Sequence, residues 1–307
     1  MWKAFMYPKA LANLFGGTSA GDAYQMDWLS DTIKIAGLKS AYTPSDTDEV
    51  YADVSSHEIS STIDATNHPA GGQTVGSKTV TYSGGVVHAA GSGLGLHRNN
   101  FDINDTHDIR WAVVYDDSVT DDPLLGYVDF NKLIGHEGPT DFLPLNALAT
   151  GLDFTFASPS TGQCRWFGKA MANALGGETS GESRATDYLS DIIKVALMTE
   201  TYAPNLDTDE QFSSISANEV SGTGYTAGGV ALGSKTLALS SKTLSFGAAD
   251  PTWTLTATAA RWGVAYNDTN ADKPLLWLYD LFGPHSPASE AMNVHFAGGI
   301  AATLKCV

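Results

Sequence analysis

The chain has 307 residues, of which 43% are hydrophobic and 17% are charged. This composition is too apolar for a disordered chain and too poor in charge for a long helical rod. The formal net charge is −17, so the surface is not attracted to the phosphates of nucleic acids or to anionic lipids. We therefore expect no nucleic-acid partner, and no membrane partner either, since no stretch approaches about 18 consecutive apolar residues.

In chain order, the first predicted element is a short helix over residues 9–15, which a Gly-Gly pair ends. Residues 32–38 are expected to form a strand that leads into a Tyr-x-Pro turn. A second short helix is predicted over residues 48–54, with Thr or Asp as its N-terminal cap. Strands follow over residues 79–82 and 111–115. The latter segment is apolar on both faces, which is typical of a central strand.

The same series of elements then occurs a second time, in the same order. It predicts helices over 169–175 and 209–215 and strands over 192–198, 236–239 and 262–266. Short motifs recur with it: Gly-Ser-Lys-Thr at 76–79 and 233–236, and Pro-Leu-Leu at 123–125 and 274–276. So many colinear matches indicate a tandem duplication. Alternating segments at 252–258 and 293–296 add two predicted strands, and the expected core anchors are Trp111, Tyr115, Trp262 and Tyr266.

The predicted fold class is therefore mainly β: two tandem homologous β-sandwich or small-barrel domains with short helices. The predicted domains are residues 1–157 and 164–307, joined by a small, polar, Pro-containing linker at residues 158–163. Each part is long enough to bury a core and is expected to fold alone.

Candidate catalytic residues are not apparent in the sequence. It contains no nucleophile elbow, phosphate-binding loop, paired-Cys zinc signature or HExxH motif. The positions shared by the two copies are Gly, Pro, Tyr, Trp, small apolar residues and turn Asp, which define a shape and not a chemical role. We expect no enzyme and no cofactor. The two cysteines, Cys164 and Cys306, are expected to be free thiols, with a disulfide as the alternative.

Two acidic runs are candidates for metal binding. An Asp-Thr-Asp-Glu run occurs at 46–49 and again at 207–210. Its alternating carboxylates could hold calcium, and helix capping is the alternative interpretation. The candidate ligands are Asp46, Asp48, Glu49, Asp207, Asp209 and Glu210. A second run at 116–122, with its counterpart at 267–272, is either a calcium loop or a solvated hairpin turn.

Three segments of the second copy carry a family resemblance. Residues 188–196 read Tyr-Leu-Ser-Asp-x-Ile-Lys-x-Ala, residues 218–229 read Asn-Glu-Val-Ser-Gly-Thr-Gly-Tyr-Thr-Ala-Gly-Gly, and residues 260–266 read Ala-Arg-Trp-x-Val-x-Tyr. In this order they resemble a group of small virion proteins of tailed bacteriophages, which are variously labelled head decoration or tail fibre proteins. The first copy departs at residues 57–62 and keeps the later Ala-Gly-Gly. Together the copies cover nearly the whole chain.

The resemblance implies a structural protein of the virion, assembled in the host cytoplasm. Its partners would be the major capsid protein or other virion proteins, with self-association as a further expectation. The first interpretation is a capsid decoration (cement) protein on the outer surface of the major capsid protein, because a duplicated shape can contact two similar surfaces at once. The alternative is a tail, neck or fibre component that binds a host receptor.

Overall fold

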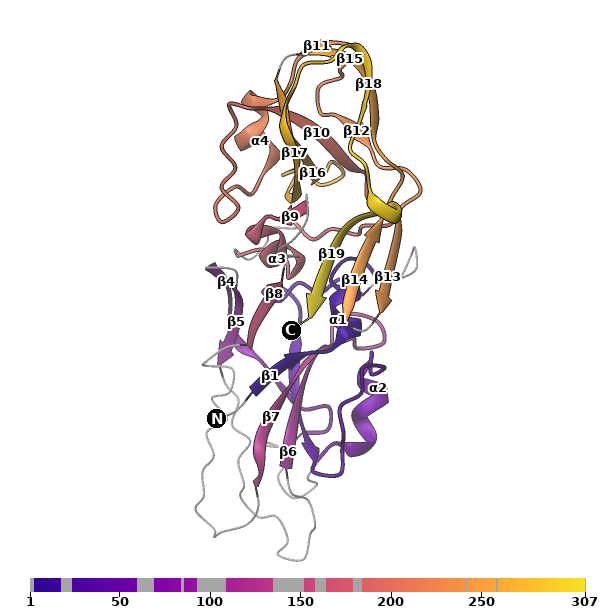
Figure 1. Ribbon diagram of the computed structural model, residues 1–307. Coiled ribbons are helices and arrows are strands. Elements are labelled where there is room, and N and C mark those ends of the chain that lie inside the picture. Colours follow the sequence, from indigo (N-terminus) through magenta and orange to yellow (C-terminus); the bar gives the residue numbers. More distant parts are fainter. Residues whose placement is uncertain are drawn as a thin grey trace, which may run out of the picture.

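In the computed structural model, the chain consists of antiparallel β-sheets and a few short helices (Figure 1). The structure describes residues 3–17, 24–59, 69–83, 86–92, 109–134, 152–157, 164–178, 184–240, 242–257 and 259–306. The first half of the chain, in indigo to magenta, lies below the second half, in orange to yellow. The mainly-β prediction with short helices is confirmed, and the predicted linker at 158–163 lies outside the described residues.

The first half contains a five-stranded antiparallel sheet with the strand order β1-β7-β6-β2-β3. Its strands are β1 (Lys3–Met6), β2 (Ile33–Lys39), β3 (Gln73–Thr74), β6 (Ile109–Asp116) and β7 (Leu124–Ile134). Helix α1 (Pro8–Asn13) follows β1, while α2 (Tyr51–Val54) and the 3-10 helix η1 (Ser55–His57) connect β2 to β3. Strand β6 is central, as its apolar run predicts, because both of its faces are buried.

The second half contains a five-stranded sheet with the order β12-β10-β16-β17-β9. Its strands are β9 (Cys164–Trp166), β10 (Ile193–Thr199), β12 (Val230–Ala231), β16 (Ala260–Asn267) and β17 (Leu275–His285). Helix α3 (Gly168–Ala174) follows β9, and α4 (Phe212–Ile215) with the 3-10 helix η3 (Ser216–Asn218) follows β10. The two five-stranded sheets thus place their elements in the same spatial order.

The register of the central strand pairs also agrees between the halves. Ile33 of β2 lies opposite Asp116 of β6, and the pairing slips after Leu38. Ile193 of β10 lies opposite Asn267 of β16, and the pairing slips after Met198. Because a one-residue shift would turn every side chain to the other face, an equal register places matched residues in matched environments.

A six-stranded sheet joins the halves, with the order β13-β14-β19-β8-β5-β4. Its strands are β4 (Gly76–Ser83), β5 (Val86–Ser92), β8 (Leu152–Ala157), β13 (Thr236–Ser240), β14 (Thr243–Gly247) and β19 (Ile300–Cys306). Three come from each half, and the halves meet where β19 pairs with β8, at Lys305 opposite Ala157. Strand hydrogen bonds therefore continue from one half into the other.

Reciprocal contacts accompany this shared sheet. The backbone N–H of Trp28 donates to the carbonyl of Leu175 at 2.9 Å, and the N–H of Tyr188 donates to the carbonyl of Phe15 at 3.0 Å. Helix α1 packs on β13 and β14 of the second half, and α3 packs on β4 and β5 of the first. Each half therefore supplies a helix and a loop to the other.

A three-stranded sheet lies at the top of Figure 1, with the order β11-β15-β18. Its strands are β11 (Gly222–Thr223), β15 (Thr252–Ala257) and β18 (Ala288–Asn293). The predicted alternation of β15 is confirmed, since Trp253 and Leu255 are buried and the alternating Thr252, Thr254 and Thr256 are exposed. The strand predicted over 293–296 is wrong: β18 ends at Asn293, and the 3-10 helix η4 (Ala297–Gly299) begins soon afterwards.

The tryptophans divide into buried and peripheral ones. Trp28 and Trp277 are fully buried, as are the predicted anchors Tyr115 and Tyr266. The prediction is wrong for Trp111 and Trp262, which are only partly buried at the margin of the core. A register slip lies next to each of these residues, and the guanidinium group of the preceding arginine lies over each ring.

The predicted helices and their Gly-Gly ends are confirmed, but the predicted N-terminal caps are not. Gly16 and Gly17 end α1 with positive φ angles of 93° and 83°, as the Gly-Gly signal indicates. Val50 and Gln211 occupy the N-cap positions of α2 and α4, so the Thr or Asp cap was wrong. At α2 the carboxylate of Asp53 inside the helix accepts the backbone N–H of Val50 at 3.1 Å. The capping carboxylate of this helix therefore lies within its first turn and not before its first residue.

Cys164 is a free thiol, and burial raises its pKa to about 12. Cys306 ends β19, and its side chain lies outside the described part of the structure.

Among the helices of the described segments, none is long and apolar enough to cross a membrane.

Candidate interaction surface

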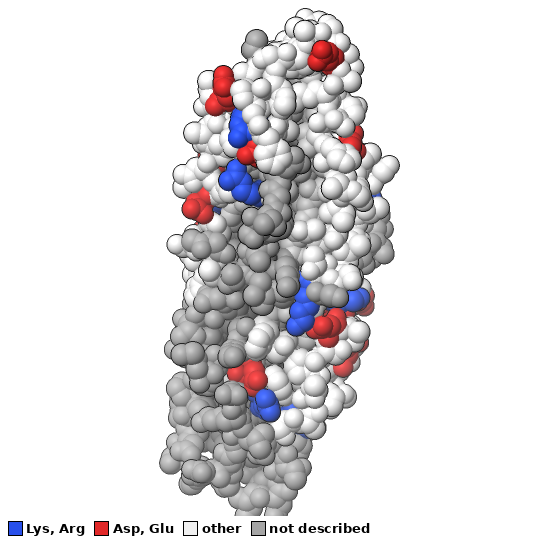
Figure 2. Space-filling model, in the orientation of Figure 1, with Lys and Arg blue, Asp and Glu red and all other residues white. Residues whose placement is uncertain are grey.

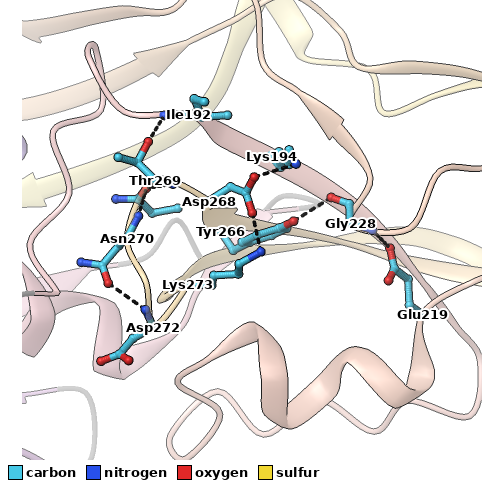
Figure 3. Close-up of polar contacts among 11 residues, drawn as sticks. Ile192, Lys194, Glu219, Gly228, Tyr266, Asp268, Thr269, Asn270, Asp272 and Lys273 are labelled. Atoms are coloured by element: carbon cyan, nitrogen blue, oxygen red, sulfur yellow. Dashed lines mark hydrogen bonds and ion pairs between the residues drawn. The ribbon is translucent and has the colours of Figure 1, made fainter.

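A polar network beside the β16–β17 hairpin is shown in Figure 3. Asp268 bonds to Lys194 at 2.6 Å and to Lys273 at 2.8 Å. Burial raises the pKa of Asp268, but these two lysines outweigh burial and leave the pKa below its usual value. The hydroxyl of Tyr266 donates to the carbonyl of Gly228 at 2.8 Å. The network thus ties the hairpin to strand β10 and to the Gly228 turn.

The first half repeats this arrangement. Lys34 pairs with Asp117 at 2.8 Å, and the Tyr115 hydroxyl donates to the carbonyl of Gly71. Glu58 accepts the N–H of Gly71 at 2.8 Å, just as Glu219 accepts the N–H of Gly228 at 2.6 Å. Because its polar groups bond to one another in the same way in both halves, we interpret this network as a structural one that holds the turns against the central strands.

The candidate calcium ligands have protein partners. Asp48 accepts the Tyr42 hydroxyl at 2.7 Å, and Asp209 accepts the Tyr202 hydroxyl at 2.6 Å. These bonds fix the Tyr-x-Pro turn of each half. Asp46 lies 3.7 Å from Lys242.

The remaining candidates connect neighbouring elements. Glu49 pairs with Lys9 at 2.8 Å, Glu210 pairs with Arg184 at 2.7 Å, and Asp207 accepts the Tyr82 hydroxyl at 3.0 Å. The structure does not bring three or more His, Cys, Asp or Glu side chains into a metal-binding group anywhere among the described residues. The second acidic run lies at a hairpin turn in both halves, but its first residues, Asp116 and Asn267, are fully buried and not solvated.

An interruption in strand β17 forms an exposed loop. Trp262 of β16 lies opposite Asp280, while Ala260 lies opposite His285, so residues 281–284 bulge out of the ladder. Phe282 at this bulge is 73% exposed, the most exposed large apolar side chain of the described chain. Its φ of 60° is a left-handed conformation that costs about 1–3 kcal/mol for a bulky residue.

The base of the bulge is firmly held. Asp280 accepts the N–H of Phe282 at 2.6 Å and bonds to the Arg261 guanidinium, which lies over the Trp262 ring at 4.3 Å. Burial raises the pKa of Asp280, but the Phe282 N–H and Arg261 outweigh burial and lower it overall. The ring of His285 contacts the carbonyl of Leu281 at 2.8 Å. The strained backbone is thus fixed by several independent contacts.

A cavity of about 390 Å³ lies between this segment of β17 and the edge strand β18. Leu281 and Met292 give it apolar walls, and Glu290, His285 and His295 give it polar ones. His295 bonds to Asp250 at 2.8 Å, which keeps the pKa of that carboxyl below its usual value. Strand β18, which contributes residues to this lining, is an edge strand of its three-stranded sheet.

The same bulge exists in the first half but with other residues. Trp111 lies opposite Asp129 and Ile109 opposite Ile134, so residues 130–133 bulge out of β7. Arg110 pairs with Asp129 there, as Arg261 pairs with Asp280. Phe130 is buried, whereas the matched second-half residue, Leu281, is only partly buried.

Among the described residues on the face in Figure 2, the charged side chains lie singly or beside a group of opposite sign. This agrees with the low charged fraction of the sequence.

Comparison of the chain with protein-family models, curated proteins and solved structures finds no match.

Sequence reasoning missed the Phe282 bulge. Phe282-Gly283-Pro284 does contain a signal, because a Gly-Pro pair inside a strand marks an interruption. That signal lies directly after the second Pro-Leu-Leu motif and its apolar run.

Proposed function

We propose that this protein is a non-enzymatic structural protein of a tailed-bacteriophage virion, most specifically a capsid decoration protein on the outer surface of the major capsid protein. The chain would descend from the tandem duplication of a β-sandwich or small-barrel domain. The single observation that supports this is the repeated frame: two sheets with one strand order, one register and one set of tying contacts.

Duplication matters because the halves are coupled through the six-stranded sheet. Two coupled docking faces bind a surface with repeated subunits more tightly than either face alone, because the second contact forms at a high effective concentration. Capsid shells offer such repeated surfaces. In this proposal, the buried residues of the repeated frame maintain the fold. The exposed residues that differ between the halves determine which partner surface each half binds.

The Phe282 bulge is the proposed anchor of the second half. An exposed aromatic ring on a rigid, strained loop has little conformational entropy left to lose when it enters a pocket of the partner. We propose that the partner pocket is apolar with a basic or neutral rim, because the chain itself carries a net charge of −17.

The alternative, a tail, neck or fibre component, is favoured by one observation, the cavity of about 390 Å³ beside the bulge. Its Met, His and Glu lining would suit a small host ligand. Copy number separates the two roles: on the order of hundreds per particle for decoration and roughly a few dozen or fewer for a tail part.

The experiment is the location and count of this chain in purified particles, by cryo-electron microscopy and quantitative mass spectrometry. Density on the outer face of the shell supports decoration, and density confined to the tail supports the alternative. Absence from the particle would overturn the virion proposal altogether.

Binding of the purified chain to particles that lack it tests the anchor. Phe282→Ser should weaken binding by about 2 kcal/mol or more, as loss of a buried aromatic anchor does. Ile192→Ser is the control, because Ile192 is also apolar and 51% exposed but lies outside the bulge. Equal binding by both variants would contradict the proposed anchor role of Phe282 but would not contradict the virion proposal.

A further inference from the structure

Asp116 and Asn267 occupy matched positions with different chemistry. Each lies opposite the first residue of the neighbouring strand, Ile33 or Ile193, and each is fully buried. Each also begins its hairpin turn through Oδ1, which accepts the N–H of Ser118 at 2.8 Å in the first half and that of Thr269 at 3.0 Å in the second. The difference between the two residues therefore lies in their second polar atom.

In the second half, that atom is an amide nitrogen with two partners. Nδ2 of Asn267 donates to Oδ2 of Asp191 at 2.7 Å and to Oγ1 of Thr186 at 3.2 Å. The same Asp191 oxygen accepts the N–H of Asp187 at 2.9 Å. The contact is a donor meeting acceptors and needs no additional proton.

In the first half, the corresponding atom is an oxygen that faces the carboxyl of Asp31. No N–H or hydroxyl of the described residues donates to Oδ2 of Asp116. Oδ2 of Asp31 already accepts the N–H of Asp27 at 2.5 Å. Two ionised carboxylates offer only acceptors, so they can hydrogen-bond to each other only through a proton.

We propose that Asp31 and Asp116 share one proton in the folded protein, and that this proton is a pH-sensitive lock on residues 24–32, the loop by which the first half contacts the second. Asn267 and Asp191 form the matched lock of the second half, with an amide in place of the proton, so that lock does not respond to pH.

The charged groups around the pair favour this assignment. Asp27 adds a third carboxylate, and Lys78 interacts with all three; its Nζ donates to the backbone carbonyl of Asp31. Lys34 is engaged by Asp117 at 2.8 Å. Met26 is buried in the same loop, at the position that Thr186 holds in the second half. Fewer dipoles therefore stabilise a second negative charge there.

Burial, followed by the hydrogen bond with Asp31, raises the pKa of Asp116 from 3.8 to about 7. A carboxyl whose pKa is raised by folding binds its proton more tightly in the folded state. Its contribution to stability is therefore complete below pH 3.8 and is lost as pH rises to about 7. Across that window the folding equilibrium constant should fall by up to about tenfold per pH unit from this site.

The lock is connected to the contact between the halves. The loop holds Trp28, whose N–H donates to the carbonyl of Leu175 at 2.9 Å, and Asp27, which lies against Gly176. The matched loop of the second half holds Tyr188, whose N–H donates to Phe15 at 3.0 Å. Loss of the proton should loosen the Trp28 contact and leave the Tyr188 contact unchanged.

Amide hydrogen exchange of the full chain tests this prediction, with protection factors at Trp28 and Tyr188 measured from about pH 5 to about pH 8. We expect the Trp28 factor to fall by about tenfold or more relative to that of Tyr188. Asp116→Asn, which copies the second half, should abolish the difference. Asn267→Asp should give Tyr188 the same pH dependence.

Parallel pH profiles for Trp28 and Tyr188 in the wild-type chain, or a dependence that survives Asp116→Asn, would overturn the lock. If the variants fail to fold, the carboxyl ¹³C shifts of Asp31 and Asp116 in the wild-type chain decide the question. Two carboxyls that are both ionised at about pH 5 would refute the shared proton. None of these outcomes bears on the virion role.

Discussion

The two halves of this protein share one arrangement of strands and contacts but differ at particular residues. Both carry the same strand order, the same bulge in the long hairpin strand and the same Tyr–Gly and Lys–Asp ties. They differ in the bulge sequence, where Asn131 of the first half corresponds to Phe282 of the second, and at the buried position filled by Asp116 or Asn267. Frame positions are constrained by packing and register, while the differing positions are where separate contacts or responses can develop.

Of the changes proposed here, separating the halves should have the largest effect on stability. Phe15 packs against Trp166 and Phe246 of the other half, with ring centroids 5.7 and 5.0 Å apart. We expect fragments 1–157 and 164–307 each to fold with stability reduced by about 3 kcal/mol or more, and to bind each other when mixed. Circular dichroism and titration calorimetry would measure both effects. Fragments as stable as the intact chain would mean that the contacts between the halves contribute little.

Truncating a core tryptophan should lower the free energy of unfolding more than truncating one at the margin of the core. Trp28→Ala should lower the free energy of unfolding by about 3–5 kcal/mol, because Trp28 is fully buried and its indole donates to Ala90 at 3.1 Å. Trp262→Ala should cost about 1–2 kcal/mol, since that ring is only partly buried. Denaturant unfolding gives both values, and equal costs would contradict the distinction.

Adding a methyl group at the matched glycines Gly16 and Gly176 tests how closely the two halves pack against each other. A Cβ on Gly176 would lie 2.5 Å from Cγ of Asp27, and one on Gly16 would lie 2.6 Å from Cγ of Asp187. Both residues also have positive φ, so Gly→Ala should cost about 1–3 kcal/mol at either site. Gly233→Ala is the control, because its Cβ would meet nothing within 4 Å. Melting temperatures unchanged by the first two variants would argue against close reciprocal packing.

The smallest expected effect concerns a contact that only one half has. Arg184 bonds to Glu210 at 2.7 Å and to Asp272 at 3.0 Å, whereas Tyr24 occupies the matched position and donates to Asp121 at 3.3 Å. Arg184→Met should cost about 1 kcal/mol at low salt and less at high salt. Tyr24→Phe should change stability by about 0.5 kcal/mol or less. A cost for Arg184→Met that does not depend on salt would point to lost packing instead of lost charge.

The amino-acid sequence by itself determined the mainly-β class, the helices that end at Gly-Gly and the central strands around Tyr115 and Tyr266. Those features depend on local signals, namely glycine conformation and apolar periodicity, which a sequence displays directly. The sequence also showed the repeated motifs that the two halves share.

Only the tertiary structure decided that the halves share a sheet, that Trp111 and Trp262 lie at the margin, and that the acidic runs bond to tyrosines, lysines and arginines. These outcomes depend on which residues far apart in the chain meet, and local periodicity does not show that. Asp116 shows the limit most clearly. In the sequence it is one aspartate of an acidic turn, and its burial against Asp31 is what makes a proton part of the fold.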